Sequence, residues 1–171
     1  MRANVSGRRM GGFTVIEMMV VVAIIAILSM LAVPSMRDMI TTQRVKTASF
    51  DMFAGLVLAR SEAIKRNTSV TITPNGGDWA LGFVATDANA NVLSRQDAFI
   101  PSKGGVADLP PGGMAPLALV GPATVTFNSM GRSTALATFA ITAPDIPNTS
   151  YRCIKLDLSG RPVSLVGTCP P

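Results

Sequence analysis

A single carboxylate stands at the start of an otherwise apolar run, and this feature constrains the fold more than any other. The run extends from Met18 to Val33 with Ser29 as its only polar residue, and Glu17 directly precedes it. Residues 13–16 extend the apolar surface on the other side of Glu17. A helix of about 20 apolar residues spans a bilayer, so residues 13–33 are predicted to form a transmembrane helix. Because a charge in a membrane helix costs free energy, we expect Glu17 to serve function rather than insertion.

A cleaved secretory signal is the alternative interpretation of this region, because a short basic segment precedes the apolar run. Two features oppose it. Glu17 lies at the mouth of the apolar core, and Ala32-Val33-Pro34 makes a poor cleavage site of the small-x-small type. A retained anchor is therefore the favoured interpretation.

The net charge of +5 raises the question of nucleic-acid binding. From residue 67 onward, however, six basic residues balance six acidic ones, so the distal domain is neutral. The sequence also contains no histidine, which removes imidazole bases and the commonest metal ligand. We expect no catalytic residue, no metal site and no cofactor.

After Pro34 the chain keeps a helical pattern but becomes amphipathic. Pro34 removes one backbone donor, so a bend is expected there rather than the end of the helix. Residues 34–66 are predicted to continue the helix of residues 13–33. Their apolar side chains recur at steps of three and four: Met36, Met39, Ile40, Met52, Phe53, Leu56, Leu58 or Ala59, Ala63 and Ile64.

The remaining residues, 67–171, are predicted to form a globular β domain. Asn75-Gly76-Gly77 supplies the positive-φ positions of a tight hairpin, and residues 101–122 are expected to form a long surface loop. The predicted strands are 69–73, 79–86, 92–100, 123–128, 135–143, 152–158 and 162–166. A helix followed by strands indicates the α+β class: a long N-terminal α-helix, with an apolar transmembrane first half, packed on a C-terminal antiparallel β-sheet or sandwich domain.

Alternation within residues 152–158 assigns side chains to the two faces of the predicted strand. Ile154, Leu156 and Leu158 are expected to point inward, whereas Lys155 and Asp157 share the outer face. The charges of Lys155 and Asp157 should therefore partly cancel on the surface.

The two cysteines lie close to paired positions of the last predicted hairpin. Reflecting Cys153 through the turn at Gly160 places it near Gly167, two residues from Cys169. A disulfide that closes the hairpin with a small offset is the favoured interpretation, and such bonds persist outside the cytoplasm. A redox or metal-binding pair is the alternative, but the spacing is long and histidine is absent.

The first residues of the chain resemble the class III signal of type IV pilins and of type II secretion pseudopilins. The resemblance rests on Gly12 followed by Phe13 and Thr14, on Glu17, and on an apolar run that ends at Pro34. The rest of the chain resembles, more loosely, the FimT/GspH group of minor pilins and secretion pseudopilins. The matching stretches are "LARSEAIKRNTSVTI", "TFNSMGR" and "CIKLDLSGRPVSLVGTC".

This resemblance implies a maturation pathway. Residues 1–12 would be a leader that a prepilin peptidase removes by cutting between Gly12 and Phe13, and the new Phe13 amine would be N-methylated. Glu17 would pair with the Phe13 amine of a neighbouring subunit during assembly. The chain would lie in the inner membrane with a periplasmic domain, meet the assembly platform and other major and minor pilins, and then enter a pilus at the cell surface.

Two alternatives to a minor type IV pilin stay open. The first is an H-type pseudopilin of a type II secretion system, which shares the same sequence signals. The second is a DNA-binding minor pilin for natural transformation, whose group carries a C-terminal Gly-Arg-x-Arg motif. Here the matching stretch is Gly160-Arg161-Pro162-Val163, which lacks the second arginine, so this role is less favoured. The candidate DNA contacts are Arg132, Arg152, Lys155 and Arg161.

Overall fold

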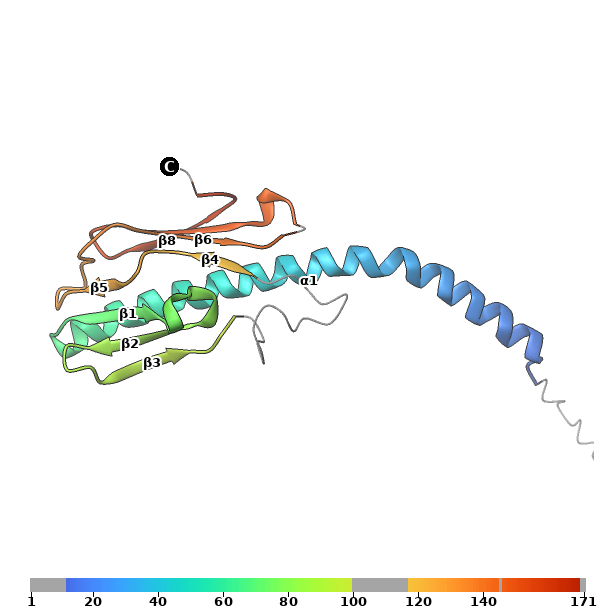
Figure 1. The fold of residues 1–171 in the computed structure, drawn as a ribbon, viewed down its shortest axis with the longest axis horizontal. Coiled ribbons are helices and arrows are strands. Elements are labelled where there is room, and N and C mark those ends of the chain that lie inside the picture. The colour runs from blue at the N-terminus through green and yellow to red at the C-terminus, as the bar shows by residue number, and fades with distance from the viewer. Residues whose placement is uncertain (1–11, 100–116, 145, 170–171) are drawn as a thin grey trace, which may run out of the picture. The chain divides into compact units, whose positions relative to one another are not determined.

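The computed structural model describes residues 12–99, 117–144 and 146–169 (Figure 1). The predicted leader lies outside the described residues apart from Gly12. One continuous helix, α1 (Val15–Arg66), begins the fold. The chain divides into two compact units, Met1–Met36 and Arg37–Pro171, and each is described by itself below.

Helix α1 ends in a Schellman motif. Asn67 adopts a positive φ of 50°, which asparagine tolerates better than most side chains. The Asn67 N–H donates to the carbonyl oxygen of Ile64 at 3.2 Å, and the Thr68 N–H donates to that of Ala63 at 3.2 Å. These bonds satisfy carbonyl groups that the helix would otherwise leave without a donor. The following residues then begin the first strand.

The second unit contains two antiparallel sheets of four strands each. The first has the order β3-β2-β1-β5 and the second the order β4-β6-β7-β8 (Figure 1). The strands of the first sheet are β1 (Val70–Pro74), β2 (Phe83–Asp87), β3 (Val92–Gln96) and β5 (Val125–Phe127). Those of the second are β4 (Ala118–Val120), β6 (Ala137–Thr142), β7 (Arg152–Leu156) and β8 (Pro162–Val166).

The second half of α1 packs on these sheets through one buried face. Its buried residues recur at steps of three and four, as a helix against a sheet requires: Val45, Ala48, Met52, Leu56, Ala59 and Ala63. They share one core with Ile72 and Phe127 of the first sheet and Phe139 and Ile154 of the second. This arrangement confirms the predicted α+β fold with a helix packed on antiparallel sheets.

The connection between β1 and β2 differs from the predicted tight hairpin. Residues Trp79–Leu81 form a 3₁₀ helix rather than part of a strand, because the Asp78 side chain accepts a hydrogen bond from the Ala80 N–H at 2.8 Å. The turn is therefore wider, and it closes with a hydrogen bond from the Asn75 N–H to the Gly82 carbonyl oxygen at 2.9 Å. Trp79 is buried and donates from Nε1 to the Pro122 carbonyl oxygen at 2.7 Å.

Two further predictions about the β domain were wrong in part. The predicted surface loop of residues 101–122 lies outside the described residues up to residue 116, but its end contains strand β4, where Leu119 pairs with Ile141 of β6 and is buried. Three residues are too few for a strand pattern to be seen in the sequence. Leu158 is exposed, because β7 ends at Leu156 and the chain turns before the alternation can continue.

Candidate functional site

The first turn of α1 is held by reciprocal hydrogen bonds between Thr14 and Glu17. The Glu17 N–H donates to Thr14 Oγ1 at 3.2 Å, and the Thr14 N–H donates to Glu17 Oε2 at 3.1 Å. Thr14 Oγ1 also lies 3.3 Å from Glu17 Oε2, and the Met18 N–H donates to the Thr14 carbonyl oxygen. This is a capping box, with Thr14 as the N-cap and Glu17 at the third helical position.

The capping box gives Glu17 a structural role that belongs to the chain itself. An acid in the first turn is also favoured by the positive end of the helix dipole. Thr14 is a functional candidate that the sequence analysis missed, although Thr followed three residues later by Glu before an apolar run is the pattern of such a box. Any role of Glu17 in assembly must therefore be separated experimentally from its role in capping.

Gly12 and Phe13 precede the helix and are exposed. A Cβ atom added to Gly12 would meet no atom of the described residues within 4 Å. Most other described glycines either adopt a positive φ or, like Gly55, lie where a side chain would collide with a neighbour. Among the described residues, therefore, no packing contact requires glycine at position 12.

The described start of the helix presents an apolar surface. All residues from 12 to 30 are exposed in this chain, and Glu17 is the one ionisable side chain among them. Within the described residues no helix has both the length and the hydropathy needed to cross a membrane, in contrast to the transmembrane helix predicted for residues 13–33.

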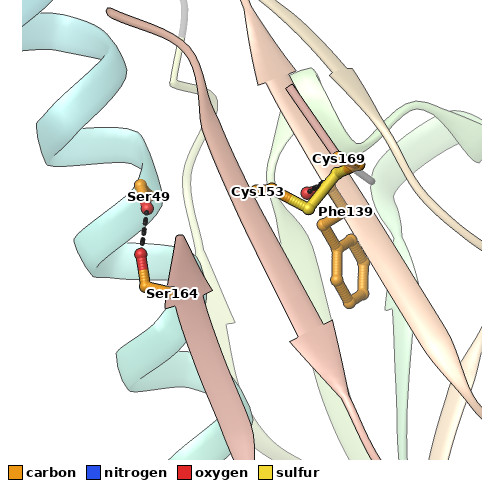
Figure 2. The surroundings of a disulfide bond; sticks show 5 residues. All are labelled: Ser49, Phe139, Cys153, Ser164 and Cys169. Carbon is orange, nitrogen blue, oxygen red and sulfur yellow. Dashed lines mark hydrogen bonds between the residues drawn. A yellow bond between two sulfur atoms is a disulfide. The ribbon is translucent and has the colours of Figure 1, made fainter. Parts of the chain in front are cut away.

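Cys153 and Cys169 form a disulfide, which confirms the predicted pair (Figure 2). Their Cα atoms are 5.1 Å apart. The register differs from the prediction, because Cys153 of β7 lies opposite Leu165 of β8 rather than near Gly167. Cys169 follows the strand, and its sulfur lies 3.5 Å from the carbonyl oxygen of Phe139 on β6. The disulfide thus joins the segment that follows β8 to strand β7.

Strand β8 is also joined to the helix. Ser49 of α1 and Ser164 of β8 point toward each other, and their hydroxyl oxygens are 3.4 Å apart (Figure 2). Ser49 is buried, so this hydrogen bond satisfies a polar group that would otherwise be costly to bury. The disulfide-linked hairpin is therefore fixed both to the helix and to the rest of its sheet.

Removing the disulfide should lower the free energy of unfolding by about 3 kcal/mol, because the bond closes a loop of about 15 residues in the unfolded chain. The variant is Cys153→Ala/Cys169→Ala, and the measurement is urea unfolding of the full chain in detergent, followed by fluorescence of Trp79, the one tryptophan. Reductant should destabilise the natural protein equally and leave the variant unchanged. If reductant left the free energy of unfolding of the natural protein unchanged, the expectation would be contradicted.

The four candidate DNA contacts do not form one cluster. Arg132 and Arg161 lie in two turns that contact each other, since a Cβ added to Gly160 would lie 3.4 Å from Arg132 Cα. Arg152 donates to the carbonyl oxygen of Tyr151 at 2.9 Å, so its guanidinium is engaged. Lys155 of β7 lies opposite Thr138 of β6, so it belongs to the sheet and not to a turn. The structure therefore brings together two of the four residues.

A capped acid at the start of an exposed apolar helix, followed by a helix-on-sheet domain with a C-terminal disulfide, defines a pilin-like subunit. The chain belongs to the GspH family: the family described as Type II transport protein GspH matches residues 48–160. The prokaryotic N-terminal methylation motif matches residues 7–33. Among curated proteins none matches this chain.

Solved structures with the same fold include two crystal forms of the type IV minor pilin FimU from Pseudomonas aeruginosa strain PAO1. The P21 form is 21% identical with a TM-score of 0.56, and the match covers 75% of this chain and 90% of FimU. The P65 form is 21% identical with a TM-score of 0.54, and covers 70% and 91% respectively. Family and motif together identify a minor type IV pilin or pseudopilin, a structural subunit that is membrane-anchored and assembles with other pilins.

Proposed function

We propose that this chain is a minor type IV pilin that is cut between Gly12 and Phe13, methylated at the Phe13 amine and then built into a filament. The observation that carries the proposal is the open space around Gly12. A glycine that folding does not need, placed beside an exposed Phe13, is suited to a protease that must approach an extended backbone closely. The methylation motif that spans residues 7–33 supports this position for the cut.

Before assembly, residues 13–33 hold the chain in the inner membrane, with the domain of residues 67–171 in the periplasm. The exposed apolar side chains of the first half of α1 support this location, and so does the disulfide, which requires an oxidising compartment. The partners are the prepilin peptidase, the inner-membrane assembly platform and the major and minor pilins. In the filament the apolar helix packs against the equivalent helices of these pilins.

Glu17 acts in the assembly step. Its Oε2 atom accepts from Thr14, and a carboxylate has room for further donors on its other oxygen. Cleavage creates an ammonium group on Phe13. The second oxygen of Glu17 can form an ion pair with the Phe13 ammonium group of a neighbouring subunit. Pairing would offset the cost of keeping a carboxylate in an apolar environment. Capping and assembly can therefore use the same side chain.

Mass spectrometry of the protein from a piliated host should find a chain that begins at methylated Phe13. Gly12→Val should accumulate as the uncut precursor, because a branched side chain obstructs the protease, while Gly12→Ala should be cut more slowly than the natural protein. Neither change should alter the fold, because a Cβ at this position meets nothing within 4 Å. A mature chain that begins after Val33 would instead show a cleaved secretory signal and refute the proposal.

An H-type pseudopilin is the second candidate, because the description of the matching family refers to type II transport. Both subunits would be processed identically, so processing does not separate them. Deletion of the gene should abolish surface pili in the first case. In the second case pili should remain and a type II secretion substrate should accumulate in the periplasm.

A further inference from the structure

Two turns of the β domain share one sequence pattern and one geometry. The first, Asn128–Arg132, follows β5, and the second, Asp157–Arg161, joins β7 to β8. Each begins with Asn or Asp and ends with Gly-Arg. Asn128 Oδ1 accepts from the Arg132 N–H at 2.9 Å, and Asp157 Oδ1 accepts from the Arg161 N–H at 3.0 Å. In both turns the glycine has a positive φ, 72° at Gly131 and 76° at Gly160.

The two turns support each other. A Cβ added to Gly160 would overlap the carbonyl oxygen of Gly131, and one added to Gly131 would overlap the side chain of Ile64 on α1. The first turn therefore lies between the helix and the second turn, with close backbone contact. The backbone that carries the side chains of each turn is therefore packed against its neighbour.

The two turns and the residue before β6 carry exposed side chains, which we call the paired-turn surface: Met130, Arg132, Leu136, Leu158 and Arg161. Met130 is 77% exposed and Leu136 is 71% exposed. Leu136 precedes Ala137, which pairs with Leu156, the residue before the second turn. Large apolar side chains that alternate with arginine at one end of a domain are more typical of a protein interface than of a solvated surface.

The one carboxylate of the two turns, that of Asp157, already accepts hydrogen bonds from its own turn. Asp157 accepts from the Ser159 hydroxyl at 2.6 Å as well as from the Arg161 N–H. The Ser159 hydrogen bond is the main reason that the pKa of Asp157 lies below its ordinary value, and the Arg161 N–H adds to it. Neither Arg132 nor Arg161 forms an ion pair within the part of the chain that the structure describes. Both arginines are thus exposed, are carried by turns whose backbones are in close contact, and are available to an acid.

We propose that the paired-turn surface docks a neighbouring pilin subunit that presents a carboxylate beside an apolar patch. This inference rests on the proposed function, because it names a second contact of the same assembled subunit. Guanidinium groups pair with carboxylates through two parallel hydrogen bonds, and the apolar side chains would be removed from water by the same partner. A nucleic acid is a poorer fit, because its phosphates would face Asp157 and leave three large apolar side chains exposed.

The test uses Arg132→Glu/Arg161→Glu in the full chain, expressed in a piliated host that lacks the natural copy. Recovery of the variant in sheared filaments with the major pilin should fall about tenfold or more, since reversing a paired charge both removes an attraction and adds a repulsion. Recovery of Arg132→Lys/Arg161→Lys in sheared filaments should fall less, because lysine keeps the charge but not the paired hydrogen bonds. A photo-crosslinker at Met130 should link to a pilin peptide that contains Asp or Glu.

The matched control is Arg95→Glu/Lys46→Glu, which makes the same change in net charge at exposed positions of strand β3 and helix α1, outside the two turns. Equal recovery of the two charge-reversed variants would overturn the inference. Retention of double-stranded DNA that Arg132→Glu/Arg161→Glu abolishes, with filament recovery unchanged, would also overturn it and assign the surface to nucleic acid. If the natural protein itself lacks methylated Phe13 and is absent from filaments, the proposed function fails as well.

Discussion

Replacing Glu17 with glutamine should leave the protein cut at Gly12 and held in the membrane, yet reduce its recovery in filaments about tenfold or more. Glutamine occupies the same position of a capping box as glutamate does, so the Thr14 N–H keeps an acceptor and the helix start is preserved. The charge is lost, however, and with it the attraction to the Phe13 amine of a neighbour, which is strong in an apolar environment. The measurement is the amount of variant in sheared filaments relative to the major pilin.

The comparison with Glu17→Ala separates capping from charge. Alanine removes both, and loss of a capping contact costs about 1 kcal/mol of helix stability. If charge is what assembly needs, glutamine and alanine should fail to the same extent. A glutamine variant that assembles normally beside a failing alanine variant would assign Glu17 to capping alone. Normal assembly of both would refute the assembly role.

Replacing Gly160 with alanine should destabilise the β domain by about 3 kcal/mol or more, which is a large part of the usual stability of a domain. The added Cβ would overlap the carbonyl oxygen of Gly131, and a backbone atom cannot move aside as a flexible side chain can. A non-glycine residue at a φ of 76° adds strain of about 1 kcal/mol or more. Urea unfolding followed by Trp79 fluorescence measures the loss.

Gly77→Ala is the matched control, because Gly77 also has a positive φ, 83°, but its added Cβ would meet nothing within 4 Å. The free energy of unfolding of this variant should fall only by the strain of the backbone, about 1 kcal/mol. The difference between the two variants isolates the contact between the paired turns. Equal losses would show that the turns are not in close contact in solution.

Local patterns account for the parts of this protein that could be predicted. The helix ends at Arg66 as its three- and four-residue period indicated, and strand β8 occupies the five residues expected from alternation. The disulfide followed from two cysteines near one hairpin, although the true partner of Cys153 across the strands is Leu165. The hydrogen bonds of Thr14 and Asp78 also follow from short-range patterns, because each side chain bonds to a backbone N–H two or three residues along the chain.

Contacts between residues far apart in the sequence account for what could not be predicted. Gly55 reads as a weak point of the helix, but the ring of Phe83 occupies the space that a side chain there would need. The helical period identified an apolar stripe, yet Met39 and Ile64 are exposed while Val45 and Ala48 are buried. A period shows that one face is apolar, and only the position of the sheets decides which residues they cover.

The sequence by itself determined the apolar helix with its acid, the β domain, the cysteine pair and the likeness to pilins, because each depends on residue types at short spacing. Only the tertiary structure decided that glycine is unnecessary at position 12 and required at position 160. It also placed Arg132 and Arg161 on turns that touch, although the two arginines are 29 positions apart in the sequence. Packing between distant segments sets these relations, because the space around a residue depends on what the rest of the chain brings beside it.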